Sequence, residues 1–522
     1  MQLIIPMSGL GQRFQKAGYK IPKPLIEVEG KIIVEHILEM FPGVNKVIFI
    51  CNKDHLRNPN FKMREKLLKL NVNAKIISID QHKKGPIHAV LKCLSYIDLD
   101  EATIVNYCDF NCIWDYKKFI KHVKNTNCDG CVVTYTGFHP HMVGNTNYAY
   151  VKLYKDKIID IQEKKPFTNN PMSEHASSGT YYFKSGEIMS KYFKKTVDED
   201  LNTKGEYYVS MSYKPMINDN LNLNIFNLDK FMQWGTPEDL EEYKWFSELF
   251  KVKNNPSYTK NFKIEGNTLI PCAGLGKRFS REGYLLPKPL IKVSKKPMLI
   301  QALNYLPSTN NLQIVFRNSM KGVNSLMKEV KKYYPQSSFY LLDRETNGQA
   351  ETCTYGAKSL NNDLPLTISA CDNGILYNPD NFKKLLKDKS IDIIVWGCKN
   401  YPGAKRNPEM YGWIEEKNNL IKKIHVKKIY QDPKLDPIII GTFTFKKGSF
   451  FLSSVNDLMQ NGSKVNGEYY VDSSINHAIE MGYKVVYFPV DFYLCWGTPN
   501  DLKTYEYWDN CFSSWANHSY KR

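Results

Sequence analysis

Two short stretches of the chain combine glycines with fixed positive charges: residues 9–28 read GLGQRFQKAGYKIPKPLIEV, and residues 274–293 read GLGKRFSREGYLLPKPLIKV. The glycines allow tight turns and a close approach of the backbone to a ligand. Arg13 and Arg278 each add a planar donor fork, while Lys23 and Lys288 stand between prolines that stiffen the segment. Together with backbone N–H groups, these cations would form a cradle for a triphosphate.

Neither stretch matches the common phosphate-loop motifs. A dinucleotide fingerprint, GxGxxG, would need glycine at position 14, where Phe14 stands. No GK[ST] follows, so a Walker loop is excluded. One copy alone could be a solvated basic turn, but equal spacing in two copies argues against that interpretation.

An aspartate follows an apolar run in each half of the chain. Asp109 stands in YCDF and Asp372 in ACDN. A carboxylate at the end of a strand suits Mg²⁺, a hard cation that takes oxygen ligands and bridges phosphates; the alternative is an ordinary turn aspartate. Lys164 and Lys427 also follow predicted strands, where they would bind a second phosphate or, alternatively, be surface lysines.

The similarity between the halves extends over nearly the whole chain. Seven landmarks recur in one order, and their offset drifts only from 265 positions at Gly9 and Gly274 to 262 at the two WGTP motifs. Such a series indicates a tandem duplication of a full domain. We predict domain 1 at residues 1–250, a polar linker at 251–266 and domain 2 at 267–522.

Short apolar runs alternate with helical patterns along the chain. LIIPM, KVIFIC and TIVNYC have the character of buried strands, whereas KIIVEHILEMF and IHAVLKCLSYI have the spacing of helices. This βαβα order predicts an α/β fold with a mainly parallel mixed sheet and helices on both faces. Ligands of such sheets bind at the carboxyl ends of the strands, where we expect the glycine loops and the two aspartates.

The net charge of +18 fits an anionic partner such as a nucleotide or sugar phosphate, or simply a lysine-rich composition. The basic residues are dispersed and form no arginine-rich arm, so no nucleic-acid partner is expected. No run of about 18 apolar residues is present, and the first residues lack the basic region of a secretory signal. We therefore expect a cytoplasmic protein without a membrane partner; homo-oligomerisation is left open.

As an ordered set, the motifs resemble the sugar-phosphate nucleotidyltransferases, most closely the capsule-biosynthesis branch of that family. The set comprises G-L-G-x-R-F, P-K-P-L, the aspartate after a strand, E-K or V-K, G-T-[YF]-x-F, G-E-Y-Y and W-G-T-P-x-D-L, each present twice. The resemblance implies two tandem Rossmann-like, GT-A-like domains. It implies an enzyme that joins an NTP to a phosphorylated sugar or polyol and releases pyrophosphate, with Mg²⁺ as cofactor, to make a precursor of a surface polysaccharide. CTP is favoured on the branch resemblance alone.

The resemblance also implies roles for individual residues. The catalytic set would be Arg13, Lys23, Asp109, Lys164, Arg278, Lys288, Asp372 and Lys427, with Asp109 and Asp372 as metal ligands. The nucleotide would contact Ser8, Gly9, Leu10, Gly11, Gln81 and Gly85 in the first copy, and Ala273, Gly274, Leu275, Gly276, Arg344 and Gly348 in the second. The phosphorylated acceptor would contact Glu163, Lys164, Gly179, Lys427 and Gly441.

Two positions depart from the family pattern. The second metal-binding aspartate of better-known members is replaced by Gln233 in one copy and Cys495 in the other, so the metal would rely on phosphates and water or on another ligand. At the base-reading position, Gln81 corresponds to Arg344, which argues against one base preference for both copies. The WGTP motifs have a structural interpretation, because T-P-x-D can form a capping box and start a helix.

Alternative functions remain open at this stage. One half could be a binding or dimerisation pseudo-domain, or the chain could be a related-fold glycosyltransferase that uses a nucleotide sugar. Glycosyltransferases usually carry D-x-D at the metal strand, whereas here the strands end in CDF and CDN. Because both copies keep the cationic and acidic set, we predict two separate active sites. Val426 in place of Glu163 would remove a hydroxyl-binding carboxylate from the second site and so change its acceptor.

Overall fold

The chain was analysed as a computed structural model that describes residues 1–259 and 262–521. Internal contacts divide it into two compact units, Met1–Lys244 with Ser513–Lys521 and Trp245–Phe512, and each is described by itself. This division differs from the predicted boundaries, because Trp245 and Ile264 pack in the hydrophobic core of the second unit. Most of the predicted linker at 251–266 therefore belongs to a folded unit, while its residues 260–261 lie outside the described residues.

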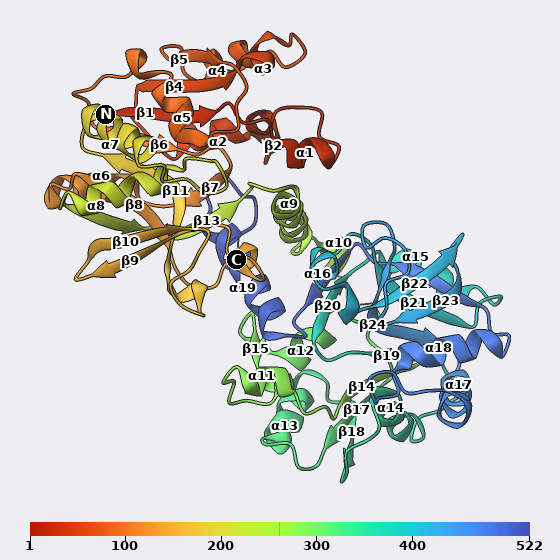
Figure 1. Cartoon of the computed structure of the whole chain (residues 1–522). Helices are drawn as coiled ribbons and strands as arrows, with labels where there is room; N and C mark the ends of the chain where they lie inside the picture. Colours follow the sequence, from red (N-terminus) through yellow and green to blue (C-terminus); the bar gives the residue numbers. More distant parts are fainter. Residues whose placement is uncertain (260–261, 522) are drawn as a thin grey trace. The chain divides into compact units, whose positions relative to one another are not determined.

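The first unit is built on a mixed sheet with the strand order β5-β4-β1-β6-β11-β8-β12-β10-β9 (Figure 1). Its strands are β1 (Gln2–Met7), β4 (Lys46–Asn52), β5 (Lys75–Ile79), β6 (Thr103–Asn106), β8 (Gly130–Tyr135), β9 (Ala149–Tyr154), β10 (Lys157–Glu163), β11 (His175–Phe183) and β12 (Leu223–Asn227). Strand β1 is parallel to both β4 and β6, so the chain leaves β1 at a point where the strand order reverses. The crevice at such a point is the usual ligand site of an open α/β sheet.

The second unit repeats this topology strand for strand, in the order β18-β17-β14-β19-β24-β21-β25-β23-β22. Its strands are β14 (Asn267–Cys272), β17 (Asn311–Arg317), β18 (Ser337–Leu342), β19 (Leu366–Ser369), β21 (Ile393–Cys398), β22 (Gly412–Lys417), β23 (Leu420–Val426), β24 (Ile438–Phe445) and β25 (Val485–Pro489). The predicted α/β class, with two tandem Rossmann-like domains, is confirmed.

Alternating side chains along the strands build a core on each face of each sheet. In β1, Leu3 and Ile5 belong to one buried cluster and Ile4 to the other. Because successive strand residues point to opposite faces, a strand buried on both sides reads as a continuous apolar run, which is why LIIPM carries no polar alternation. In the second unit, Ile270 and Leu269 divide between two clusters in the same way.

Helices cover both faces of each sheet. In the first unit the helices are α1 (Gln12–Lys16), α2 (Ile33–Glu39), α3 (Lys53–Arg57), α4 (Met63–Leu70), α5 (Gly85–Leu91), α6 (Tyr116–Thr126), α7 (Gly186–Asp198) and α8 (Tyr213–Asn218). Helices α2, α4 and α6 contribute to one core cluster, and α5, α7 and α8 to the other. The later helices are α9 (Pro237–Val252), α10 (Pro256–Thr259), α11 (Lys277–Arg281), α12 (Met298–Leu303), α13 (Val323–Tyr333), α14 (Gln349–Ala357), α15 (Pro379–Lys387), α16 (Pro402–Arg406), α17 (Gly448–Asn461), α18 (Val471–Glu480) and α19 (Pro499–Ser514).

Small two-stranded ladders and short 3₁₀ turns hold the loops at the carboxyl edge of each sheet. The ladders are β7 (Phe110–Ile113) with β13 (Lys230–Gln233), β20 (Asn373–Leu376) with β26 (Phe492–Cys495), β2 (Glu27–Val28) with β3 (Lys31–Ile32), and β15 (Lys292–Val293) with β16 (Lys296–Pro297). The 3₁₀ turns used below are η1 (Lys23–Leu25), η5 (Val209–Ser212), η6 (Lys288–Leu290) and η7 (Pro408–Met410). None of the described helices is long and apolar enough to cross a membrane.

The WGTP motifs start helices, as predicted. The Thr236 hydroxyl accepts a hydrogen bond from the Asp239 N–H at 3.1 Å and donates to the Asp239 carboxylate at 2.8 Å. Thr498 and Asp501 make the same pair of bonds, at 3.2 and 2.7 Å. Helices α9 and α19 begin at the prolines that follow these threonines, so the motif places a helix start directly after β13 and β26.

We predict that Thr498→Ala lowers the free energy of unfolding by about 1 kcal/mol, because the Asp501 N–H loses its side-chain acceptor. Thr498→Ser is the matched control, since it keeps the hydroxyl. Urea unfolding followed by circular dichroism measures both variants. A Thr498→Ala protein as stable as the serine variant would show that the cap contributes nothing.

Candidate functional site

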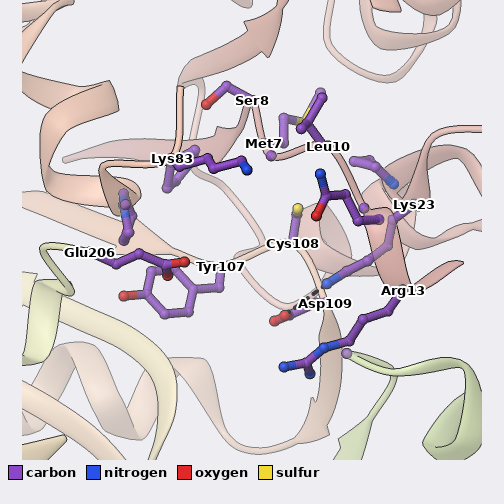
Figure 2. A pocket seen from close by; sticks show the side chains of 18 of the residues that line it. Met7, Ser8, Leu10, Arg13, Lys23, Lys83, Tyr107, Cys108, Asp109 and Glu206 are labelled. Carbon is purple, nitrogen blue, oxygen red and sulfur yellow. Dashed lines mark hydrogen bonds and ion pairs between the residues drawn. The ribbon is translucent and has the colours of Figure 1, made fainter. Parts of the chain in front are cut away.

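A cavity of about 530 Å³ opens at the carboxyl ends of β1 and β6 in the first unit. Figure 2 shows the charged side chains of its lining turned toward one another. The lining includes Ser8, Gly9, Leu10, Gly11, Arg13, Lys23, His82, Lys83, Gly85, Pro86, Tyr107, Cys108, Asp109, Glu206, Tyr208 and Gly235. Eight residues of the predicted site set therefore meet in one place: Ser8, Gly9, Leu10, Gly11, Arg13, Lys23, Gly85 and Asp109.

An ion pair joins the two predicted charged loops. The Lys23 ammonium lies 2.9 Å from a carboxylate oxygen of Asp109, and the two side chains are 17% and 32% exposed. Lys23 opens the 3₁₀ turn η1 between prolines, so its stem is held in place. Asp109 stands three residues beyond β6, and its carbonyl accepts from the Trp234 N–H at 3.0 Å, which ties it to the β7–β13 ladder.

The glycine loop leaves its arginine available to a ligand. Gly11 has φ +63° and caps α1, a conformation that glycine adopts without strain. A methyl group placed on Gly9 would meet no protein atom within 4 Å. The exposed Arg13 side chain makes no hydrogen bond to any part of the chain that the structure describes. A guanidinium with open donors beside an open backbone is suited to bind an anion.

The G-E-Y-Y segment, a repeated landmark for which no site role was predicted, links the two sides of this cavity. Tyr207 exchanges backbone hydrogen bonds with the loop before α5, donating to the Lys84 carbonyl at 3.0 Å and accepting from the Ile87 N–H at 3.2 Å. A Cβ on Gly85, whose φ is +83°, would lie 2.7 Å from the backbone N and O of Tyr207. Glycine is thus required here by backbone packing. The recurrence of G-E-Y-Y in both halves was the signal that could have identified this role.

The same segment reaches the predicted acceptor lysine. The Lys164 ammonium donates to the Tyr208 hydroxyl at 2.6 Å, and that hydroxyl donates to Glu206 at 2.5 Å. Lys164 itself is outside the cavity lining, behind Tyr208. Its φ of +58° is matched by +56° at Lys427. A left-handed backbone is uncommon for a residue other than glycine and clusters at functional positions, so both copies hold this lysine in the same unusual conformation.

Two further predicted acceptor residues lie near this lysine, outside the cavity lining. Glu163 accepts a hydrogen bond from the Ser210 hydroxyl at 2.6 Å; burial raises the pKa of its carboxyl, and the Ser210 bond opposes that shift. Gly179 has φ +97°, and a Cβ there would lie 3.0 Å from the ring of Tyr107. Gly179 thus makes room for a cavity wall and does not itself line the cavity.

The second unit has a corresponding cavity of about 480 Å³. Its lining includes Ala273, Gly274, Leu275, Gly276, Lys277, Arg278, Lys288, Arg317, Glu345, Thr346, Gly348, Gln349, Thr352, Glu468 and Gly497. Lys288 and Asp372 form an ion pair equivalent to that of the first unit. Burial lowers the pKa of Lys288, but the Asp372 carboxylate and its other neighbours outweigh that effect and raise it. The Arg278 side chain makes no hydrogen bond within the described residues.

Neither residue at the predicted base-reading position lines its cavity. Gln81 is followed by His82 and Lys83, which do. The Arg344 side chain is 73% exposed and turns to helix α14, where it donates to the Tyr355 hydroxyl at 2.8 Å. The similarity of the two halves identifies the loop that borders the cavity, but it does not show which side chains of that loop line the cavity.

The second cavity gains a cation that sequence analysis missed. Asn52 donates to the Ser8 carbonyl at 3.4 Å in the first unit, and Arg317 donates to the Ala273 carbonyl at the same distance in the second. These residues are equivalent, because each ends the strand beside the glycine loop. Arg317 therefore supports the loop in place of a buried amide and adds a guanidinium to the lining.

Gln233 and Cys495 lie beside the two aspartates, where the family pattern would place a second carboxylate. A Cβ on Gly235 would be 3.1 Å from the Gln233 amide nitrogen and 3.2 Å from an Asp109 carboxylate oxygen. A Cβ on Gly497 would likewise be 3.3 Å from Asp372 and 3.5 Å from the Cys495 sulfur. The described residues contain no group of three or more histidine, cysteine, aspartate or glutamate side chains arranged to hold a metal.

Residues 3–246 match the family model described as nucleotidyl transferase. The first unit belongs to the nucleotidyl transferase family. The second unit repeats its strand order and site residues, and is a second copy of the same domain. The Bifunctional protein GlmU of Methanocaldococcus jannaschii is 26% identical over 274 residues, which cover 52% of this chain and 60% of that protein. That of Thermodesulfovibrio yellowstonii is 26% identical over 233 residues, covering 44% and 47%.

Solved structures with a similar chain trace include a nucleoside-diphosphate-sugar pyrophosphorylase from Vibrio cholerae RC9, with a TM-score of 0.38, 22% identity and coverage of 46% of this chain and 97% of that one. The inositol-1-phosphate CTP transferase from T. maritima has a TM-score of 0.38, 15% identity and coverage of 50% and 100%. The chain spans between 47% and 60% of the length of the two curated relatives named above.

We predict that Gly85→Ala destabilises the nucleotidyl transferase unit by more than about 1 kcal/mol, because alanine is strained at positive φ and its methyl group meets the Tyr207 backbone. Gly205→Ala is the matched control: its φ is +80°, but a Cβ there meets nothing within 4 Å. Thermal unfolding compares them. Equal losses would show that the Tyr207 contact carries no cost beyond the backbone angle.

Proposed function

We propose that each unit joins an NTP to a phosphorylated sugar or polyol and releases pyrophosphate. The observation that carries this proposal is the convergence, in both units, of a glycine loop, a lysine and an arginine with no ion pair among the described residues on one cavity of the family fold, with an aspartate paired to that lysine. CTP is the favoured nucleotide, and a precursor of a surface polysaccharide the favoured product; both preferences rest on motif resemblance alone.

The chemistry asks the chain to hold two anions together. A phosphomonoester has a second pKa of about 6, so at neutral pH it is largely a dianion and needs no general base. It would attack the α-phosphorus in line with the departing pyrophosphate. Arg13 and Lys23 would neutralise charge on the nucleotide phosphates, and Lys164 would hold the acceptor phosphate. Catalysis of this kind is positioning and electrostatics, and one such donor is typically worth about 10²–10³ in rate.

The donor set fits Mg²⁺ only as a metal shared with the nucleotide. Beside its glycine loop each site offers one carboxylate, Asp109 or Asp372, which is paired with a lysine; the other lining carboxylates are Glu206 in the first cavity and Glu345 and Glu468 in the second. Mg²⁺ commonly binds proteins through one or two carboxylates, with the remaining positions taken by phosphates and water. When bound, the metal would offset charge on the phosphates, and in the first site Asp109, with Gln233 beside it, would hold it.

The loops before α5 and α14 would contact the nucleotide base, and their residues differ between the two units. His82, Lys83 and Pro86 line the first cavity, where the second has Glu345, Thr346 and Gln349. Position by position, an imidazole is replaced by a carboxylate, an ammonium group by a hydroxyl, and a proline ring by an amide that both donates and accepts hydrogen bonds. A site built around hydrogen bonds strongly rejects a ligand that cannot complete them, so these exchanges support separate preferences.

We predict that divalent metal binds tightly only together with the nucleotide, because one paired carboxylate is too few ligands. Mn²⁺, as a paramagnetic probe for Mg²⁺, should show weak binding to the protein alone and strong binding when CTP is added. The Asp109→Asn, Asp372→Asn double variant with CTP is the control and should match CTP without protein. Full pyrophosphate release in excess EDTA would contradict the prediction.

We predict that Asp109→Asn and Asp372→Asn each abolish one of two distinct activities, since each aspartate serves its own cavity. Each variant is assayed for pyrophosphate release with the four NTPs and a panel of sugar and polyol phosphates. The expected result is that each variant loses the substrates the other keeps. If one substitution removes every activity and the other none, the silent half is a pseudo-domain. If both merely halve one shared activity, the sites have not diverged.

A further inference from the structure

Three equivalent positions beside the acceptor lysines differ between the units as a set. Ala149 pairs with Glu163 across β9 and β10, and Gly412 pairs with Val426 across β22 and β23. The third position lies four residues after the glutamate of each G-E-Y-Y turn. It is Ser210 in the first unit and Asp472 in the second. The first unit therefore has alanine, glutamate and serine where the second has glycine, valine and aspartate.

In the first unit the carboxylate comes from the strand. Glu163 ends β10 directly before Lys164, and the Ser210 hydroxyl donates to it at 2.6 Å. The glutamate keeps part of its surface accessible. It is thus a supported, half-buried acceptor beside a cation.

In the second unit the uncharged Val426 stands at the position of Glu163, and a carboxylate comes instead from Asp472 on α18. Asp472 lies in the first turn of α18, where the helix dipole favours a negative charge. Burial raises the pKa of the Asp472 carboxyl, and the charge of Lys427 opposes that shift. The carboxylate accepts no hydrogen bond from any other residue in the part of the chain that the structure describes, and the side chain remains partly accessible.

Gly412 makes room for this carboxylate. A Cβ at position 412 would lie 2.6 Å from an Asp472 carboxylate oxygen. Alanine, which occupies the equivalent position 149, would therefore force Asp472 to move. The loss of the glutamate, the gain of the aspartate and the loss of the methyl group form one consistent exchange.

We propose that Asp472 is the residue with which the second site reads a hydroxyl group of its acceptor. The proposal rests on the proposed transfer to a phosphorylated sugar or polyol: Lys427 holds the phosphate and Asp472 accepts a hydrogen bond from a hydroxyl. The proposal thus gives the second site a hydroxyl-binding carboxylate, which the sequence comparison of Glu163 with Val426 predicts to be absent. Because the carboxylate enters from α18 and not from the strand, the two sites recognise hydroxyls placed differently from the phosphate.

The competing role for Asp472 is only to balance the charge of Lys427. The two roles differ toward a phosphate that carries no hydroxyl. We test them in an Asp109→Asn background, with glucose 1-phosphate, ribitol 5-phosphate and glycerol 3-phosphate as acceptors and methyl phosphate as a competitive inhibitor. Calorimetric binding of the same phosphates to CTP-loaded protein provides a readout that needs no turnover.

Asp472→Asn should weaken the best hydroxylated acceptor by about 10- to 100-fold, as expected for a hydrogen bond to a charged group, and leave methyl phosphate almost unchanged. Equal effects on both would overturn the proposal, because a charge-balancing residue acts through the phosphate. If no acceptor releases pyrophosphate but calorimetry shows the selective loss, the proposed transfer fails and the role of Asp472 stands.

Gly412→Ala provides a second variant that keeps every charge. It should reproduce the selective loss by displacing the carboxylate. The matched Ala149→Gly, made in an Asp372→Asn background so that the first site is measured, should leave that site's acceptors unaffected. The Gly412→Ala, Val426→Glu, Asp472→Ser variant rebuilds the first unit's set and should bind the first site's acceptor better than Asp472→Asn does. A Gly412→Ala protein that is folded and unaltered toward every acceptor would overturn the proposal.

Discussion

The close backbone contact between the G-E-Y-Y turn and the loop before the base-side helix is the constraint on which each site depends. Tyr207 and Tyr469 each make one main-chain hydrogen bond to that loop and one to the first turn of the helix, across Gly85 and Gly348, where a Cβ would lie within 3 Å of the tyrosine backbone. The turn then presents a glutamate to the cavity and a tyrosine to the acceptor lysine. One rigid contact thus sets the distance between the nucleotide side and the acceptor side, which are far apart in the sequence.

The charges of the lining residues indicate that each cavity suits an anionic ligand. Each cavity contains more cations than carboxylates in its lining, and its arginine makes no hydrogen bond within the described residues. Among the described residues, the lysine–aspartate pair is the ion pair that compensates part of this charge. A bound polyanion would pair with the remaining cations, and its binding energy would then be available to position the reacting groups.

The sequence was informative where function requires a residue type at a fixed place in a loop. The glycine loops, Lys23 with Asp109, and the two capping boxes follow from local spacing. The directions of Gln81 and Arg344 could not be predicted, since both occupy an irregular loop in which the neighbouring residues, and not these two, line the cavity. The predicted linker at 251–266 rests on polar composition, which hides Ile264, an apolar residue of the second core.

On the acceptor side, the sequence comparison considered the exchange of Glu163 for Val426 as a single position. The carboxylate reappears at Asp472, on another element, and only the backbone register shows that Ala149 has become Gly412 to admit it. Holding both carboxylates in one site would place two like charges beside a single lysine, which costs more than either alone. The glutamate must therefore be lost before the aspartate can be accommodated. On the proposed role of Asp472, the second copy changes which hydroxyl it binds only if all three positions change together.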